Sequence, residues 1–175
     1  MKFFYLLVVG AVSVASFVIA AESPSIPYLQ DQKLSSNVAS IISGSNNLSE
    51  KVIALADIFN NLKLSETERI SAANALALQT DSAGIEKLLQ NIDVTLKTQD
   101  GINYIAVDAL VIAGDRAVAP ILEFLQRTEQ NKRRALAVQA IVQIKGDGYQ
   151  EFVDFVKSKV SPKVLESLVV YGVKY

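Results

Sequence analysis

The side chains that could carry chemistry in this 175-residue chain are mainly carboxylates and aromatic rings, because the sequence contains no histidine and no cysteine. A Ser-His-Asp or Cys-His couple, a thiolate or imidazole metal ligand and a disulfide are therefore all excluded. Glu151 and Asp154 form an acid pair at helical spacing, but such pairs are common on exposed helix faces and spacing alone does not indicate catalysis. No phosphate-binding glycine loop, GxSxG turn or SxxK motif occurs. We expect a protein that is not an enzyme and that uses no cofactor or metal.

The most regular set of polar and aromatic residues lies beside the apolar stripes, at two neighbouring positions that recur along the chain. The sequence predicts a protein-binding strip made of Asp57, Gln90, Glu123, Phe124, Asp154 and Phe155. A row of acidic groups beside aromatic rings suits a basic or aromatic-rich segment of another protein. The alternative is that the acids are only solvated and that the two phenylalanines wedge between packed helices.

The charge balance gives little attraction for nucleic acid. Lys and Arg total 17 against 18 Asp and Glu, so the net charge is -1 and no long-range field favours a polyanion. The main basic cluster is Lys132, Arg133 and Arg134, with Arg127 nearby, and it lacks neighbouring aromatic residues on which bases could stack. We therefore expect a protein partner and no nucleic acid.

The elements that would position the strip follow from an apolar stripe that recurs at a nearly constant interval. Apolar residues at positions i, i+3, i+4 and i+7 mark one face of a helix. The stripes are Val52, Leu55, Ala56, Phe59; Ile85, Leu88, Leu89, Ile92; Val118, Ile121, Leu122, Leu125; and Tyr149, Phe152, Val153, Val156. The first three begin 33 residues apart (52, 85, 118) and the fourth begins 31 residues later (149), which predicts a repeat of one structural unit.

A second set of helices lies between these stripes, so each unit holds a helix A followed by a helix B that carries the stripe. The A helices are marked by the matched pairs Ile41-Ile42, Ala75-Leu76, Ala109-Leu110 and Ala140-Ile141. Strict alternation is absent, so strands are not expected. The predicted fold is all-α: an α-solenoid of about four antiparallel helix pairs over residues 36–175, with a C-terminal capping helix from Pro162.

Capping signals place the helix boundaries. Ser65 and Glu68 predict a capping box at the start of one A helix, and Ser49 is the predicted cap of the first B helix. Gly114 and Gly146 each precede an aspartate and are expected to end A helices in a left-handed turn.

The first 21 residues read as a signal peptide, because one lysine precedes an apolar run that ends in small residues. Cleavage before Ala21 or Glu22 fits the sequence, and a retained membrane anchor is the alternative reading. Residues 22–35 contain Pro24 and Pro27 and are expected to form an irregular arm. We predict a periplasmic or secreted monomer that has no membrane span once the signal peptide is removed.

The segment Ala106–Leu125, AVDALVIAGDRAVAPILEFL, resembles the HEAT-like (armadillo-type) repeats of the phycobilin-lyase type. The segment Arg134–Asp147, RALAVQAIVQIKGD, repeats its first half. The resemblance implies a basic residue six positions before the second small residue of helix A; Arg69 and Arg134 stand there, and Asn103 replaces it in the third copy. The resemblance supports the helical-repeat fold and implies no particular activity. We favour a scaffold that binds another protein through its B helices, with a chromophore-lyase-like enzyme or enzyme subunit and a DNA-lesion-binding repeat protein as alternatives.

Overall fold

The computed structural model describes residues 34–44, 47–98 and 101–171, and nearly all of this part of the chain is helical. The elements in chain order are α1 (Ser36–Gly44), α2 (Leu48–Asn60), α3 (Glu66–Gln79), α4 (Ser82–Gln90), β1 (Thr95–Thr98), β2 (Gly101–Tyr104), α5 (Ile105–Ala113), α6 (Asp115–Arg127), α7 (Asn131–Lys145), the short 3-10 helix η1 (Gly146–Gly148), α8 (Tyr149–Val156) and α9 (Pro162–Tyr171). The predicted predominance of helix is confirmed.

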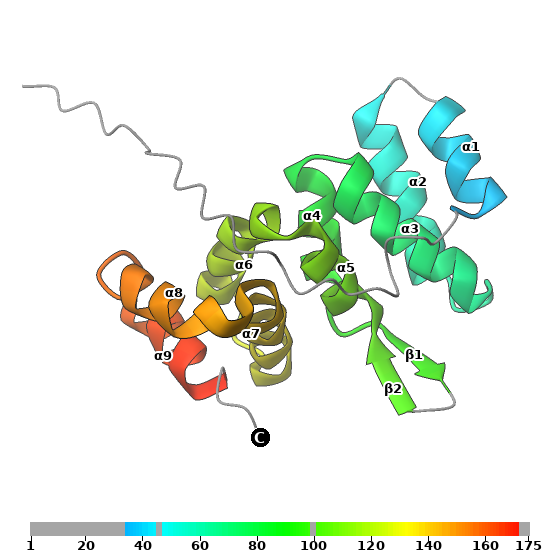
Figure 1. The fold of residues 1–175 in the computed structure, drawn as a ribbon. Helices are drawn as coiled ribbons and strands as arrows, with labels where there is room; N and C mark the ends of the chain where they lie inside the picture. Colours follow the sequence, from blue (N-terminus) through cyan, green and yellow to red (C-terminus); the bar gives the residue numbers. More distant parts are fainter. Residues whose placement is uncertain (1–33, 45–46, 99–100, 172–175) are drawn as a thin grey trace, which may run out of the picture.

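The helices pack in two series that alternate along the chain (Figure 1). Helices α1, α3, α5 and α7 each contact the next member of their series. Helices α2, α4 and α6 do the same on the other side, and each also packs against the following helix of the first series. The first series corresponds to the predicted A helices and the second to the first three predicted B helices, whose outer surface is called the B-helix face below.

The predicted stripes of the first two B helices lie in the core. All four stripe residues of α2 and all four that begin at Ile85 are buried. The stripe of α6 is shifted from the prediction: Ile121 and Leu125 are buried, whereas Val118 and Leu122 are only half-buried. Phe124 takes part of their place in the core, so the buried face of α6 is turned slightly about the helix axis.

The ends of the helices follow the capping signals with one exception. The Ser65 side chain accepts from the backbone N–H of Glu68, and the Glu68 carboxylate bonds back to Ser65, so the predicted capping box is confirmed. Gly114 (φ 61°) and Gly146 (φ 53°) adopt the left-handed region at the ends of α5 and α7, as predicted. The predicted cap of α2 is wrong: Asn47 is the capping residue, and its Oδ1 accepts from the backbone N–H of Ser49 at 3.0 Å.

A hairpin interrupts the helices between α4 and α5, so the prediction that strands are absent is wrong. Strands β1 and β2 pair antiparallel, with Thr95 opposite Tyr104 and Thr98 opposite Gly101 (Figure 1). Gly101 has a φ of 134°, which favours glycine. Each strand is only four residues long, too short for alternation to stand out, although threonine and tyrosine favour strands and Asp-Gly favours hairpin turns.

The C-terminal end departs from the repeat. We predicted that α8 stacks as the fourth B helix and that the segment from Pro162 is a terminal cap. The main contacts of α8 are with α7, η1 and α9, whereas α9 packs against both α6 and α7. The Tyr149 hydroxyl of α8 donates to the Leu168 carbonyl of α9, and burial raises the pKa of this phenol to about 12. Helix α9 therefore occupies the place beside α6 that the prediction gave to α8.

The predicted signal peptide and residues 22–33 of the predicted arm lie outside the described residues. Within residues 34–44, 47–98 and 101–171, every helix is too short or too polar to cross a bilayer. Helix α1 begins at Ser36, where the helical domain is predicted to start.

Candidate functional site

The predicted binding strip is distributed over four helices and is only partly continuous. Asp57 lies on α2, Gln90 at the end of α4 and Glu123 on α6, and all three are exposed. These helices contact one another in sequence, so the three residues occupy successive positions on the B-helix face. Asp154 and Phe155 are also exposed, but they lie on α8, whose main contacts are elsewhere. Their place in a binding strip with Asp57, Gln90 and Glu123 therefore stays a prediction.

Phe124 belongs to the core rather than to the strip. Its side chain is buried, and the guanidinium carbon of Arg133 stands 5.3 Å from the centre of its ring. The ring thus packs between α6 and α7, as the alternative reading of the sequence expected. Phe155 is different, because it is 72% exposed and wedges between no described elements. Of the six predicted strip residues, Asp57, Gln90 and Glu123 remain together on the B-helix face.

A groove on this face went unrecognised in the sequence. It lies between α2 and α4, has a volume of about 510 Å³, and is lined by Leu48, Ser49, Val52, Ile53, Asp81, Ala83, Glu86 and Lys87. Ile53 is 54% exposed and Leu48 is 39% exposed, on adjacent turns of α2. Asp57 is one turn beyond Ile53, so the strip and the groove adjoin.

The two helices that form the groove both begin at side-chain caps. Asn47 caps α2, and Asp81 caps α4 by accepting from the backbone N–H of Ala83 at 2.8 Å. The first turn of α4 packs directly on the end of α3 at Gly84, where an added Cβ would stand 2.4 Å from the Leu76 carbonyl oxygen. Only glycine allows this approach, and it fixes the position of the groove wall.

The ends of α2 and α6 are bound by buried arginines of the following A helix. Arg69 Nε donates to the Phe59 carbonyl at 3.1 Å, and desolvation by burial lowers the pKa of this guanidinium. Arg134 Nη1 donates to the Thr128 carbonyl at 3.3 Å. Because helix C-termini leave carbonyl groups unpaired, these bonds supply missing partners. The six-residue spacing in the sequence had marked both positions.

At the end of α4, a different residue donates hydrogen bonds to the carbonyl groups. Asn103, which replaces the arginine in this copy, lies on β2, and Arg133 reaches from α7 instead. Its Nη2 donates to the Leu89 carbonyl at 3.0 Å and also to the Gln90 carbonyl. Lys132 lies 5.3 Å from the centre of the Tyr104 ring. The predicted basic cluster is thus engaged within the fold, at the junction of α4, the hairpin and α7.

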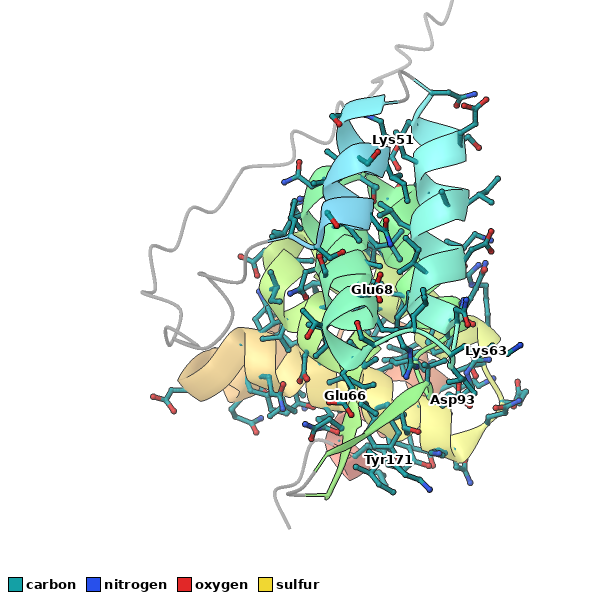
Figure 2. All side chains as sticks on the ribbon, turned by 90° about the vertical axis from the view of Figure 1, so that its right-hand side faces the viewer. Lys51, Lys63, Glu66, Glu68, Asp93 and Tyr171 are labelled. Carbon is teal, nitrogen blue, oxygen red and sulfur yellow. The ribbon has the colours of Figure 1, made fainter. Side chains whose placement is uncertain are left out.

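The charged residues outside the core gather in no metal-binding arrangement. Figure 2 labels Lys63 and Asp93, which follow α2 and α4, in the lower right part of the view, and Glu66 and Glu68 on the first turn of α3. Asn37 of α1 donates to Glu68 at 2.8 Å, and this bond and the one from Ser65 lower the pKa of the carboxyl. Among the described residues no three acidic side chains lie together as metal ligands would.

The groove between α2 and α4, bordered by the strip, is therefore the candidate site. Comparison with known proteins adds no functional assignment to this geometry. A scan against protein-family models, a search of curated proteins and a search of solved structures each returned no match.

Proposed function

We propose that this chain is an exported, non-catalytic scaffold of HEAT-like helical repeats that binds another protein through its B-helix face. The two parallel series of helix contacts support a solenoid, because a repeat stack joins each helix pair mainly to its neighbours. A rigid stack of this kind loses little conformational freedom when it binds. The capping arginines and the glycine at the groove wall support such rigidity.

The observation that carries the proposal is the exposure of Leu48 and Ile53 along a groove of about 510 Å³. Aliphatic side chains kept in water cost free energy that burial against a partner would recover, about 25 cal/mol for each Å² covered. An amphipathic helix or extended segment laid along such a groove is a recurrent mode of protein recognition. Asp57, beside the groove, would lie at the polar rim of that interface.

Substitution of Ile53 by Asp tests the proposal. A carboxylate in place of this side chain, 54% exposed on the B-helix face, should leave the free energy of unfolding within about 0.5 kcal/mol while weakening partner binding about tenfold or more. The partner is isolated by capture on the wild-type chain, identified by mass spectrometry and then titrated calorimetrically against each variant.

Leu78→Asp is the matched control, because Leu78 is similarly exposed, at 49%, but lies on α3 in the other series of helices. Its affinity should equal that of the wild-type chain. Equal affinities for wild type and Ile53→Asp, or an equal loss in both variants, would remove the B-helix face from consideration.

A further inference from the structure

The hairpin formed by β1 and β2 has two outer edges, and its register shows which backbone groups each edge presents. Two residues separate its closing pair, and the members of such a pair exchange both of their hydrogen bonds. Bonded and non-bonded pairs alternate along an antiparallel ladder, so Lys97–Ile102 and Thr95–Tyr104 are non-hydrogen-bonded pairs. The backbone N–H and C=O groups of these four residues therefore point away from the hairpin.

The two edges differ in how many of these groups already have partners. At the β1 edge, Arg69 Nη2 of α3 donates to the Thr95 carbonyl at 3.4 Å. At the β2 edge, Tyr104 precedes the first residue of α5, so its carbonyl is directed into the first turn of that helix. Among the described residues, none bonds to the N–H or C=O of Ile102 or to the N–H of Tyr104. The β2 edge thus presents three backbone groups that a further strand could pair.

Strand β2 also lacks the features that usually protect an edge. Proteins guard exposed edges with charged side chains, prolines or a covering element, because an open edge pairs readily with a strand of another chain. The sequence of β2, GINY, contains neither a charge nor a proline. Its Ile102 is 61% exposed, and Figure 1 shows the hairpin extending away from the helices. An edge of this kind can accept an extended segment as an added strand.

Two lysines set the charge beside this edge. Lys97 stands opposite Ile102, so the two side chains lie on the same face of the hairpin, which Tyr104 shares. The ammonium of Lys132, at the start of α7, lies 5.3 Å from the centre of the Tyr104 ring. Both lysines are exposed, and neither forms an ion pair with a carboxylate in the described part of the chain. This face therefore favours an anionic occupant.

We propose that the β2 edge binds an extended acidic segment of a partner protein, which adds to the hairpin as a third strand. The backbone of the segment pairs with the free groups of Ile102 and Tyr104. Alternate side chains of the segment fall on the face that carries the lysines, where carboxylates meet Lys132 and Lys97. A second copy of this chain would bring the same two lysines to the edge, and like charges oppose that pairing.

The hairpin edge and the groove between α2 and α4 are separate surfaces. On α4 the groove is lined by residues up to Lys87, whereas the hairpin begins at Thr95, beyond the end of that helix. A segment bound at one surface therefore leaves the other open.

The test uses a displayed library of random linear peptides selected on the full wild-type chain. Peptides that also bind Ile102→Pro are removed. Proline at this position eliminates one free N–H of the edge but no hydrogen bond of the ladder, and it adds no charge that could bias the selection. Unfolding in urea checks that the variant remains folded.

The expected result is that the retained peptides carry aspartate or glutamate at alternate positions. Bound peptide should slow amide hydrogen exchange at Ile102 and Tyr104 about tenfold or more, measured by NMR on the wild-type chain. Lys97 is the matched control, because its N–H points outward at the opposite edge of the same hairpin, and its exchange rate should stay unchanged.

Charge reversal tests the lysines separately. Lys132→Glu should lower peptide affinity about fivefold or more at low salt. Lys157→Glu makes the same charge change at an exposed position just after α8 and should leave the affinity unchanged. Equal affinities for wild type and Lys132→Glu would overturn the acidic preference, as would retained peptides without acidic residues.

The exchange rates decide the rest. Slower exchange at Lys97 in place of Ile102 would overturn the choice of edge. Unchanged exchange at both, or a selection that retains no peptide, would overturn strand addition. Exchange at Ile102 that slows when the protein alone is concentrated would assign the edge to a second copy of the chain and overturn the acidic partner. The Ile53→Asp experiment is unaffected by these outcomes, so the proposed function stands or fails independently.

Discussion

The spaces on either side of α4 differ although the helices that form them repeat. Between α2 and α4 the chain leaves a groove with an aliphatic wall, whereas α6 is joined to α4 by the Arg127–Glu86 ion pair and to the end of α3 by Arg116. Both spaces rest on the buried residues of α4, so the core does not explain the difference. The exposed positions do, because a stack requires a repeated apolar stripe but leaves its outer face free to change. Neighbouring units of one scaffold can therefore offer different surfaces.

The largest expected effect tests the core that both spaces share. Leu89 of α4 is fully buried, so Leu89→Ala should lower the free energy of unfolding by about 2–5 kcal/mol. Leu122 stands at the matched position of α6 but is half-buried, so Leu122→Ala should cost about 1–2 kcal/mol. Urea unfolding of the two variants gives the comparison, and equal losses would contradict the turn of α6 described above.

A smaller effect is expected from releasing α6 from the end of α3. Arg116→Ala removes the charged donor of the Thr80 carbonyl and should cost about 1–2 kcal/mol of stability. Arg116→Lys keeps the charge but loses the fork of donors and should recover only part of the loss. Urea midpoints measure both, and a neutral Arg116→Ala would mean that this arginine does not hold α6 to the end of α3.

The smallest effect concerns the ion pair between Arg127 of α6 and Glu86 of α4. Arg127 and Glu86 side chains are 57% and 34% exposed, so Arg127→Ala should cost about 0.2–1 kcal/mol. Added salt screens such a pair, so the stability difference from the wild-type chain should shrink as ionic strength rises. Thermal unfolding at low and high salt provides the measurement, and a difference that persists at high salt would point to packing rather than charge.

Much of the candidate site could be found from the sequence, but not its centre. The stripe that begins at Val52 identified which side of α2 faces inward, and hence that Asp57 faces outward. Exposed Ile53 lies outside that stripe, which was a usable signal, whereas Leu48 is one turn before Val52 on the same face of α2. The groove was missed because a pattern on one helix does not reveal what the next helix places opposite it. Ala83, for example, lines the groove only because α4 packs beside α2.

The errors in the predicted strip have a related cause. Counting by repeat aligned Phe124 with Phe155, yet one is in the core and the other is 72% exposed. Phe124 lies beside Arg133 of α7, which donates to the Leu89 carbonyl near the end of α4. Alignment by repeat assumes that matched helices pack against matched neighbours. At the C-terminal end this assumption fails, because α9 packs against α6 and α7 whereas the main contacts of α8 are with α7, η1 and α9.

The sequence by itself determined the helical character of this protein, the inward faces of α2 and α4, the capping box at Ser65 and the glycine turns at Gly114 and Gly146. These features depend on residues close together in the chain, where helical periodicity and backbone sterics act directly. Tertiary structure decided the groove, the turn of α6, the bond from Arg133 to α4 and the place of α9 beside α6. Each of these features depends on which elements far apart in the sequence pack together. That depends on how closely their side chains fit, which no single segment of the sequence shows.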